Sequence, residues 1–245
     1  MFYPTGWTEK KQKLMKNKRF NIYNFGCIAE LALSPRNNVP ILRATHSVPE
    51  KIIPFNAALS SEEGKADSYV HFFIDDYQFD RVWRSPERYV SALSKYQGII
   101  SPDFSLFIEM PIAVQRWNVY RNRVLAAYYA QAGIDAIPCA GWSDERSYGF
   151  CFEGLPKHST IAISTNGCLS SKESLYYFEK GFNRMLGALS PTAVLNYGRP
   201  VKPLFDNCKI PVIIYDSYSQ TMKRKLRRGT NGRQGRDDGQ RLCIV

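Results

Sequence analysis

Several sequence features that identify common classes of protein are missing from this chain of 245 residues. It has no run of about 18 apolar residues, and its start is polar and Lys-rich without the apolar stretch of a signal peptide. We therefore expect a cytoplasmic protein without membrane contact. Neither GxxxxGK[ST] nor GxGxxG after a strand occurs, so the common nucleotide-binding folds lose their main support. GxSxG is also absent, and no Ser/His/Asp constellation is visible.

The cysteines are not arranged in the patterns that bind a metal. The six are Cys27, Cys139, Cys151, Cys168, Cys208 and Cys243. They lie far apart and form no CxxC pair, whereas structural zinc usually takes two closely spaced pairs and a radical-type iron–sulfur site a tight triplet. We therefore expect reduced, mostly buried thiols.

Acidic residues are scarce at the two ends of the chain. Residues 1–19 carry six Lys/Arg against one Glu, and residues 222–245 carry eight against two Asp. Residues 20–221 are neutral, with 19 basic and 19 acidic residues. These counts predict a basic N-terminal segment (1–19), a folded domain (20–221) and a basic tail (222–245).

The tail is expected to be disordered, because Lys223–Arg241 mixes Arg with Gly, Asn and Gln and has no apolar periodicity. Lys10–Arg19 and Lys223–Arg241 are the candidate contacts with nucleic acid, since they hold the excess positive charge. A tail that only promotes solubility is the alternative.

Short apolar or β-branched runs predict a series of strands. They are Tyr69–Ile74, Gly98–Ser101, Ile134–Pro138, Thr160–Ser164, Thr192–Asn196 and Pro211–Tyr215, and Pro40–Thr45 adds a seventh. Most are apolar along their whole length, as in parallel sheets that are covered on both faces. Capping signals and helical periodicity predict helices over Pro86–Tyr96, from Met110 to about Gly133, and over Lys172–Leu189.

This alternation is typical of a parallel-sheet α/β protein. We predict a single (β/α) barrel-like domain, with an open doubly wound sheet as the alternative. The barrel is favoured because polar residues follow nearly every strand and do not cluster at one switch point.

The polar and aromatic residues after these strands should converge on one rim of the sheet. They are Asp75, Asp76, Asp103, Trp142, Asn166, Tyr197 and Asp216. A single Asp after a strand is usually a helix cap. Four on one rim, together with amides and aromatics, indicate a ligand site, because the carboxyl ends of parallel strands are where such folds bind ligands.

Two chemistries fit these carboxylates. Close like charges raise one pKa, so that the four Asp residues can supply an acid and a base for hydrolysis of a glycosidic or N-glycosidic bond. Alternatively Asp75 and Asp103 hold Mg²⁺ or Mn²⁺, which polarises phosphate oxygens. Trp142 and Tyr197 would stack on a sugar or a base.

The helix after Pro111 adds polar residues on its first turns. Gln115 is the candidate ligand there, with Asn118 beside it. Arg121 lies further down the helix, and we expect it to pair with an acid such as Asp103 or Glu109.

Four stretches resemble one known family. They are VHFFIDDYQFDRVWRSPERY (Val70–Tyr89), GIISPDFSLFIEMPIAVQRWNVYRNR (Gly98–Arg123), IPCAGWSDERSYGFCFEGLPKHSTIAISTNGC (Ile137–Cys168) and VLNYG (Val194–Gly198). Together they resemble the bacterial and phage family called domain of unknown function 4417, over about Pro40–Tyr215. The resemblance implies a protein of bacteria, phages or other mobile elements, and it implies no particular activity. Its family-like positions are Asn56, Asp75, Asp76, Trp83, Asp103, Ser105, Asn118, Arg121, Trp142, Gly154, Gly167 and Gly198; Asn56 enters the candidate substrate-binding set on this ground.

Two functions therefore compete. The first is an enzyme that acts on a nucleotide, a nucleic acid or a sugar at the Asp-rich rim. The second is a mobile-element protein without activity that binds nucleic acid or a host protein through its basic ends.

Overall fold

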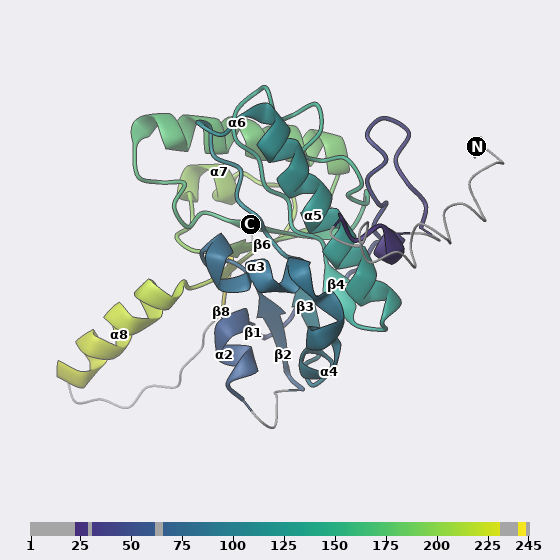
Figure 1. Cartoon of the computed structure of the whole chain (residues 1–245). Helices are drawn as coiled ribbons and strands as arrows, with labels where there is room; N and C mark the ends of the chain where they lie inside the picture. Colours follow the sequence, from purple (N-terminus) through teal and green to yellow (C-terminus); the bar gives the residue numbers. More distant parts are fainter. Residues whose placement is uncertain (1–22, 29–30, 62–65, 231–239, 244–245) are drawn as a thin grey trace, which may run out of the picture.

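The computed structural model describes residues 23–28, 31–61, 66–230 and 240–243, and Figure 1 shows their arrangement. Helices and strands alternate through most of the chain. The strands are β1 (Lys51–Pro54), β2 (Ser68–His71), β3 (Gly98–Ile100), β4 (Asp135–Ile137), β5 (Thr160–Ser164), β6 (Ala193–Tyr197), β7 (Val212–Tyr215) and β8 (Gln240–Cys243). The helices are η2 (Phe25–Ile28), α2 (Phe55–Leu59), α3 (Asp76–Arg84), η3 (Pro86–Tyr89), α4 (Val90–Leu93), α5 (Ile112–Gln131), α6 (Lys172–Leu189), α7 (Lys202–Asp206) and α8 (Tyr218–Thr230), of which η2 and η3 are 3₁₀ helices.

The strands form two sheets in which neighbours in the sequence are neighbours in space. One sheet has the order β1-β2-β3-β4 and is parallel throughout. The other has the order β5-β6-β7-β8, with only β8 antiparallel. Between the two sheets, Cys139 and Ala162 form an isolated parallel bridge, and the backbone N–H of Ala140 donates to the carbonyl of Ala162 at 2.9 Å. The predicted α/β class with parallel sheets is confirmed.

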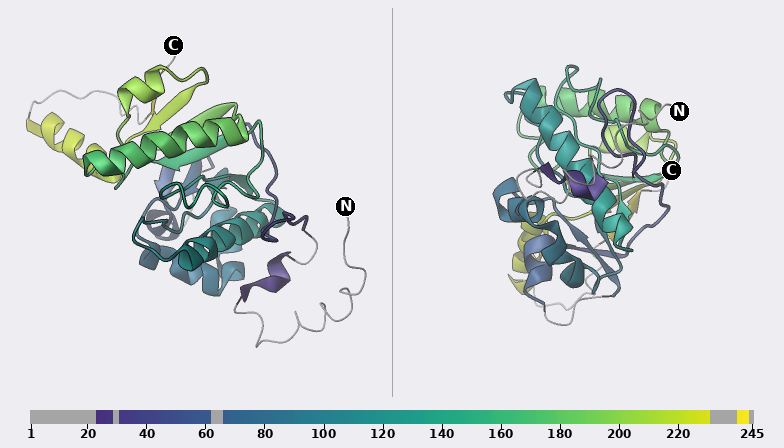
Figure 2. Two further views of the ribbon diagram at one scale, coloured as in Figure 1. Left: turned by 90° about the horizontal axis from the view of Figure 1, so that it is seen from above. Right: turned by 45° about the vertical axis from the view of Figure 1, so that its right-hand side comes forward.

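Three apolar clusters hold this arrangement together. One packs the outer face of β2 and β3 against α2, α3, α4 and α5 and includes Phe72 and Phe79. A second packs β5, β6 and β7 against α5, α6 and α7 and includes Phe182. The third joins the inner faces of both sheets, with Ile100 from one and Leu195 from the other. Figure 2 shows the two longest helices, α5 and α6, lying outside the strands. Apolar side chains therefore fill the space between the inner faces.

The strand predictions are confirmed from β2 to β7, with shifts of a few residues at the ends. The predicted strand Pro40–Thr45 is wrong. Pro40 lacks an N–H and forms only an isolated antiparallel bridge with Leu33, and the segment exchanges single hydrogen bonds, such as that from Thr160 N to the Thr45 carbonyl at 2.7 Å. The strand that precedes β2 is instead β1, whose four residues begin with Lys and end with Pro, a weak strand signal.

The long helices were predicted within a few residues, and Lys172–Leu189 is confirmed to the residue as α6. The predicted helix Pro86–Tyr96 is shorter and divides into η3 and α4. Helix α3 is not among the predicted helices.

The prediction that the tail is disordered from residue 222 is wrong at its start, because α8 extends to Thr230. Ser217 and Gln220 form a reciprocal cap: Ser217 N donates to Gln220 Oε1 at 2.9 Å, and Gln220 N donates to Ser217 Oγ at 3.4 Å. Met, Lys, Leu and Arg then continue the helix because they are good helix formers. Most of the rest of the tail, and Lys10–Arg19, lie outside the described residues. Within the described part of the chain, no helix is long and apolar enough to cross a membrane.

Candidate functional site

A cavity of about 400 Å³ lies at the carboxyl ends of β2, β3, β4 and β5. Each of these strands contributes the residues that directly follow it, and α6 closes the remaining side. The lining residues are 72–75, 103, 105–109, 140–143, 164, 166–168, 174, 177 and 178. The cavity is therefore at the rim where the sequence predicts a ligand site.

Asp103 lines this cavity and is partly buried. Burial raises the pKa of its carboxyl group to about 6, and the negative charge of Asp76 adds to the rise. A hydrogen bond with the Cys139 thiol and the positive charge of Arg123 act in the opposite direction. Gly141 leaves room for the carboxyl group, since a Cβ atom placed there would lie 3.2 Å from Asp103 Oδ1. Asp103 is thus a carboxyl group that exchanges its proton near neutral pH.

The two aspartates after β2 have different surroundings. Asp75 precedes the first residue of α3, is exposed, and lines the cavity. Asp76 turns toward the loop after β3, where it accepts hydrogen bonds from Ser105 Oγ at 2.8 Å and Ser105 N at 3.2 Å. Burial raises the pKa of Asp76, and the bonds from Ser105 oppose that rise. Asp75 therefore faces the cavity, and Asp76 holds the loop that forms one of its walls.

Gln115 and Asn118 also hold this loop and do not line the cavity. Gln115 is buried, donates to the carbonyls of Phe107 and Met110 at 3.0 Å each, and accepts from Ser143 Oγ at 2.7 Å. Asn118 Nδ2 donates to the Ser105 carbonyl at 2.6 Å. Their amide groups are occupied by the protein, so their contribution is to fix the shape of the wall.

Arg121 has the structural role that the sequence predicts, but with a different partner. It pairs with Asp80 at 3.2 Å, and its guanidinium group lies 3.5 Å from the centroid of the Phe104 ring. It also donates to Asn118 Oδ1 at 2.6 Å. The helix α3, which carries Asp80, was not predicted, so this partner was not considered.

Trp142 and Asn166 both line the cavity, as predicted for the rim. The Trp142 ring packs on α6, with its centroid 5.5 Å from that of Phe178, in a space that exists because residue 181 is Gly. Asn166 is exposed and begins the loop after β5. One wall therefore carries an aromatic ring and the mouth carries an amide group.

Three other predicted site residues lie outside the cavity lining. Tyr197 is buried between Phe73 and His71, with ring centroids 5.3 and 4.6 Å away. Asp216 forms an ion pair with Arg224 of α8. Asn56 is exposed and donates to Gln78 Oε1 at 2.9 Å. The lining does not bring these residues together with Asp103.

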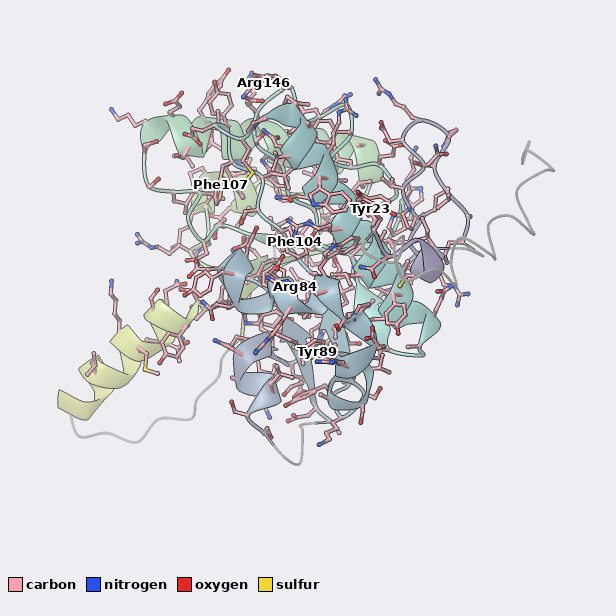
Figure 3. The ribbon with its side chains drawn as sticks, viewed as in Figure 1. Tyr23, Arg84, Tyr89, Phe104, Phe107 and Arg146 are labelled. Carbon is pink, nitrogen blue, oxygen red and sulfur yellow. The ribbon has the colours of Figure 1, made fainter. Side chains whose placement is uncertain are left out.

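Sequence reasoning missed other lining residues, among them Phe107, Glu109, Cys168 and Tyr177. Phe107 is 57% exposed, and Figure 3 labels it on the loop after β3. The length of that loop, from Ser101 to Pro111, is the one signal that points to it. In the part of the chain that the structure describes, no three His, Cys, Asp or Glu side chains are grouped so that they could hold a metal ion.

Comparisons with known proteins bear out the resemblance to one family. The family model described as "Domain of unknown function (DUF4417)" matches residues 32–216. The "Gene 1 protein" of Mycobacterium phage L5 is 37% identical over 182 residues, which cover 74% of this chain and 79% of that protein. The "Gene 1 protein" of Mycobacterium phage D29 is 39% identical over 162 residues, which cover 66% and 60%. No solved structure matches the chain.

Proposed function

The chain belongs to the DUF4417 family, whose relatives include these phage proteins, and we propose that it is an enzyme that uses acid/base chemistry at the carboxyl ends of β2–β5. The observation that carries the proposal is Asp103, a carboxyl group with a pKa of about 6 in the wall of a cavity. A general acid is most effective when its pKa lies near the working pH. Asp103 is then the proton donor, and Asp75 supplies the second carboxyl group for hydrolysis or group transfer.

The pH dependence of turnover tests this proposal. A panel of 4-nitrophenyl glycosides, 4-nitrophenyl phosphates and nucleosides is screened, and the rate is then followed from about pH 5 to about pH 8. We expect kcat/KM to fall as the pH rises through about 6, because Asp103 must carry the proton. Asp103→Asn should lower kcat by roughly 10²-fold to 10⁴-fold.

The matched control is Asp67→Asn. Asp67 is an exposed carboxylate that precedes β2 and pairs with Lys51 at 2.5 Å, at the opposite end of the strand from the cavity. Its replacement should leave the rate and its pH profile unchanged. A flat profile, or an Asp103→Asn protein as active as the wild type, would reject the acid role.

The arrangement of the two sheets also supports a barrel, which we offer as part of this proposal. Seven parallel strands follow each other in sequence order, the Cys139–Ala162 bridge joins the sheets, and their inner faces share one apolar cluster. The hydroxyl group of Tyr215 on β7 donates to the carbonyl of Pro49, just before β1, at 2.5 Å. A barrel would gather the ends of all seven strands around Asp103.

We place the protein in the cytoplasm of a bacterial cell as a further part of the proposal. The cysteines that the structure describes with their side chains, Cys27, Cys139, Cys151, Cys168 and Cys208, are free. Unpaired thiols are typical of a reducing compartment. The phage relatives support the same setting.

Helix α8 favours a second candidate function, contact with nucleic acid. The helix projects from the body of the molecule (Figure 1) and carries five Lys/Arg between Tyr218 and Thr230 without an acidic residue. Arg224 is bound to Asp216, which fixes the start of the helix. The basic residues of this helix would contact phosphate groups, and Lys10–Arg19 would add to them.

A charge-removal variant tests this second function. Replacing Lys223, Lys225, Arg227 and Arg228 with Gln should weaken binding of duplex DNA and lower the slope of log K against log[salt] by about 3 to 4, since each lost phosphate contact contributes about 0.9. The control replaces Arg84 and Arg88, which are exposed elsewhere on the surface. Equal affinity of the wild type and the α8 variant would exclude the helix as a nucleic-acid contact.

A further inference from the structure

The walls of the rim cavity carry negative side chains and no positive ones. Asp75, Asp103 and Glu109 line it, and among its described lining residues none is Lys, Arg or His. A cavity with carboxylates and without cations repels phosphate groups, because like charges in a confined space of low dielectric constant cost free energy. The lining thus selects against phosphorylated ligands.

The arginines around the cavity are bound elsewhere. Arg123 lies behind Asp103 and donates to three backbone carbonyls. Arg121 pairs with Asp80, and Arg146 pairs with Asp144 at 2.7 Å. Arg199 follows β6 and is exposed, but it does not line the cavity. Phosphate sites in proteins commonly present an Arg fork or a Lys, and the lining provides neither.

The same walls present flat apolar surfaces to solvent. Phe107 is 57% exposed although it lines the cavity, and Trp142 and Tyr177 lie in the same lining. An exposed Phe side chain gains free energy when a ring covers it, and aromatic faces stack on sugars and bases alike. These rings therefore match a ligand that has a ring face.

Hydrogen-bonding groups at the mouth complete the lining. The carboxylates of Asp75 and Glu109 accept hydrogen bonds from hydroxyl groups, and the Asn166 side chain both donates and accepts. All three are exposed and line the cavity. The volume of about 400 Å³ is that of a pocket for a small ligand, since such pockets measure about 300 to 1,000 Å³.

We infer that the cavity binds an uncharged glycoside, a free sugar or a nucleoside, whose ring lies on Phe107 and whose hydroxyl groups bind Asp75, Glu109 and Asn166. Phosphorylated forms of the same compounds are excluded by the carboxylates. This inference rests on the proposed function and names the substrate class of the same site.

The test measures equilibrium binding of matched pairs to the full-length Asp103→Asn protein by calorimetry. The pairs are adenosine and AMP, uridine and UMP, and glucose and glucose 6-phosphate, so the neutral members also separate a nucleoside from a sugar. We expect at least one neutral member to bind at least roughly tenfold more tightly than its phosphate. A tenfold ratio of Kd values corresponds to about 1.4 kcal/mol of binding free energy. Tighter binding of the phosphate, or no binding of any neutral member at millimolar concentration, would overturn the inference.

Three further variants locate the binding. Phe107→Ala should weaken it roughly tenfold, as expected for loss of one stacked ring. Tyr176→Ala is the matched control, because Tyr176 is 49% exposed on α6 and does not line the cavity. Asp75→Asn together with Glu109→Gln should reduce the gap between neutral and phosphorylated ligands. Equal losses in Phe107→Ala and Tyr176→Ala would place the ligand elsewhere and overturn the inference.

Binding and catalysis fail separately in this design. The Asp103→Asn protein reports binding without turnover, so preferential binding of a neutral member of these pairs supports the inference even if wild-type turnover shows no dependence on Asp103. Conversely, an Asp103-dependent rate limited to phosphate esters would keep the proposed function and overturn the substrate class.

Discussion

Asp103→Asn is expected to stabilise the folded protein above about pH 6 and to leave its stability unchanged at about pH 3. Burial raises the pKa of Asp103 from 3.8 to about 6, so between these values the folded chain holds a proton that the unfolded chain has lost. The free energy of unfolding of the wild type therefore falls as the pH rises through this range. This rise in the pKa corresponds to a loss of about 3 kcal/mol in the free energy of unfolding once Asp103 is ionised, and Asn avoids the loss because it does not ionise.

Chemical denaturation at a series of pH values measures this effect as the difference between the two proteins. Asp75→Asn is the control, because Asp75 is exposed at the mouth of the same cavity, and its replacement should change the free energy of unfolding by about 0.5 kcal/mol or less. If Asp103→Asn instead destabilised the protein at every pH, Asp103 would be a structural residue. If Asp103 serves catalysis instead, the wild type is expected to be less stable than Asp103→Asn.

The sequence predicts the rim because the strands can be recognised from their apolar composition and the residues that follow them must lie at their carboxyl ends. Apolar strands identify themselves by composition, and the residue that follows a parallel strand must lie at its carboxyl end. This logic placed Asp75, Asp103, Trp142 and Asn166, all of which line the cavity. It needs no knowledge of side-chain direction, and so it succeeded without tertiary information.

The logic fails where side-chain direction decides the outcome. In β6, Ala193, Leu195 and Tyr197 alternate toward the inner apolar cluster, so Tyr197 is buried among aromatic rings instead of standing on the rim. Gln115 lies in the first turns of α5, near the rim, but its amide group donates to the carbonyls of the loop after β3. Whether the amide group of Gln115 points into the cavity or toward the loop depends on the path of that loop, which the sequence does not give.

Unrecognised elements caused the remaining differences. The position of Asp216 directly after the last predicted strand indicates a ligand site, whereas α8 brings Arg224 to its carboxylate. Helix α3 was also missed, and with it the Asp80 carboxylate that pairs with Arg121. A charged residue cannot be assigned to a site until its local ion pairs are known.

The buried side chain of Arg123 contacts the long irregular segment between β4 and β5 at three points. It is 1% exposed, and its guanidinium group donates to the carbonyls of Glu153 at 2.9 Å, Cys151 at 2.6 Å and Cys139 at 3.4 Å. Burial lowers the pKa of Arg123 to about 10, which leaves the group charged at neutral pH. These three bonds join the helix α5 to the segment that forms the wall around Trp142.

Arg123→Met is expected to lower the free energy of unfolding by roughly 3 to 5 kcal/mol, because it removes the three donors and leaves buried carbonyls unpaired. Arg123→Lys should lose less, since its ammonium group keeps a charge and N–H donors but cannot form the planar fork. Arg88→Met, at an exposed position on η3, is the control and should cost less than about 0.5 kcal/mol. Urea denaturation with constant m values measures all three.

The Arg123→Met protein also carries a signature at the candidate site. The positive charge of Arg123 lowers the pKa of Asp103, so its removal should raise that pKa further above 6. The difference in stability between proteins with Asp and with Asn at position 103 should therefore be larger in the Arg123→Met background than in the wild type. A loss of stability below about 1 kcal/mol would show that the other contacts of the segment hold it without Arg123. An unchanged difference at position 103 would show that the charge of Arg123 does not affect Asp103, and the pKa of Asp103 would then be set by burial, Asp76 and Cys139.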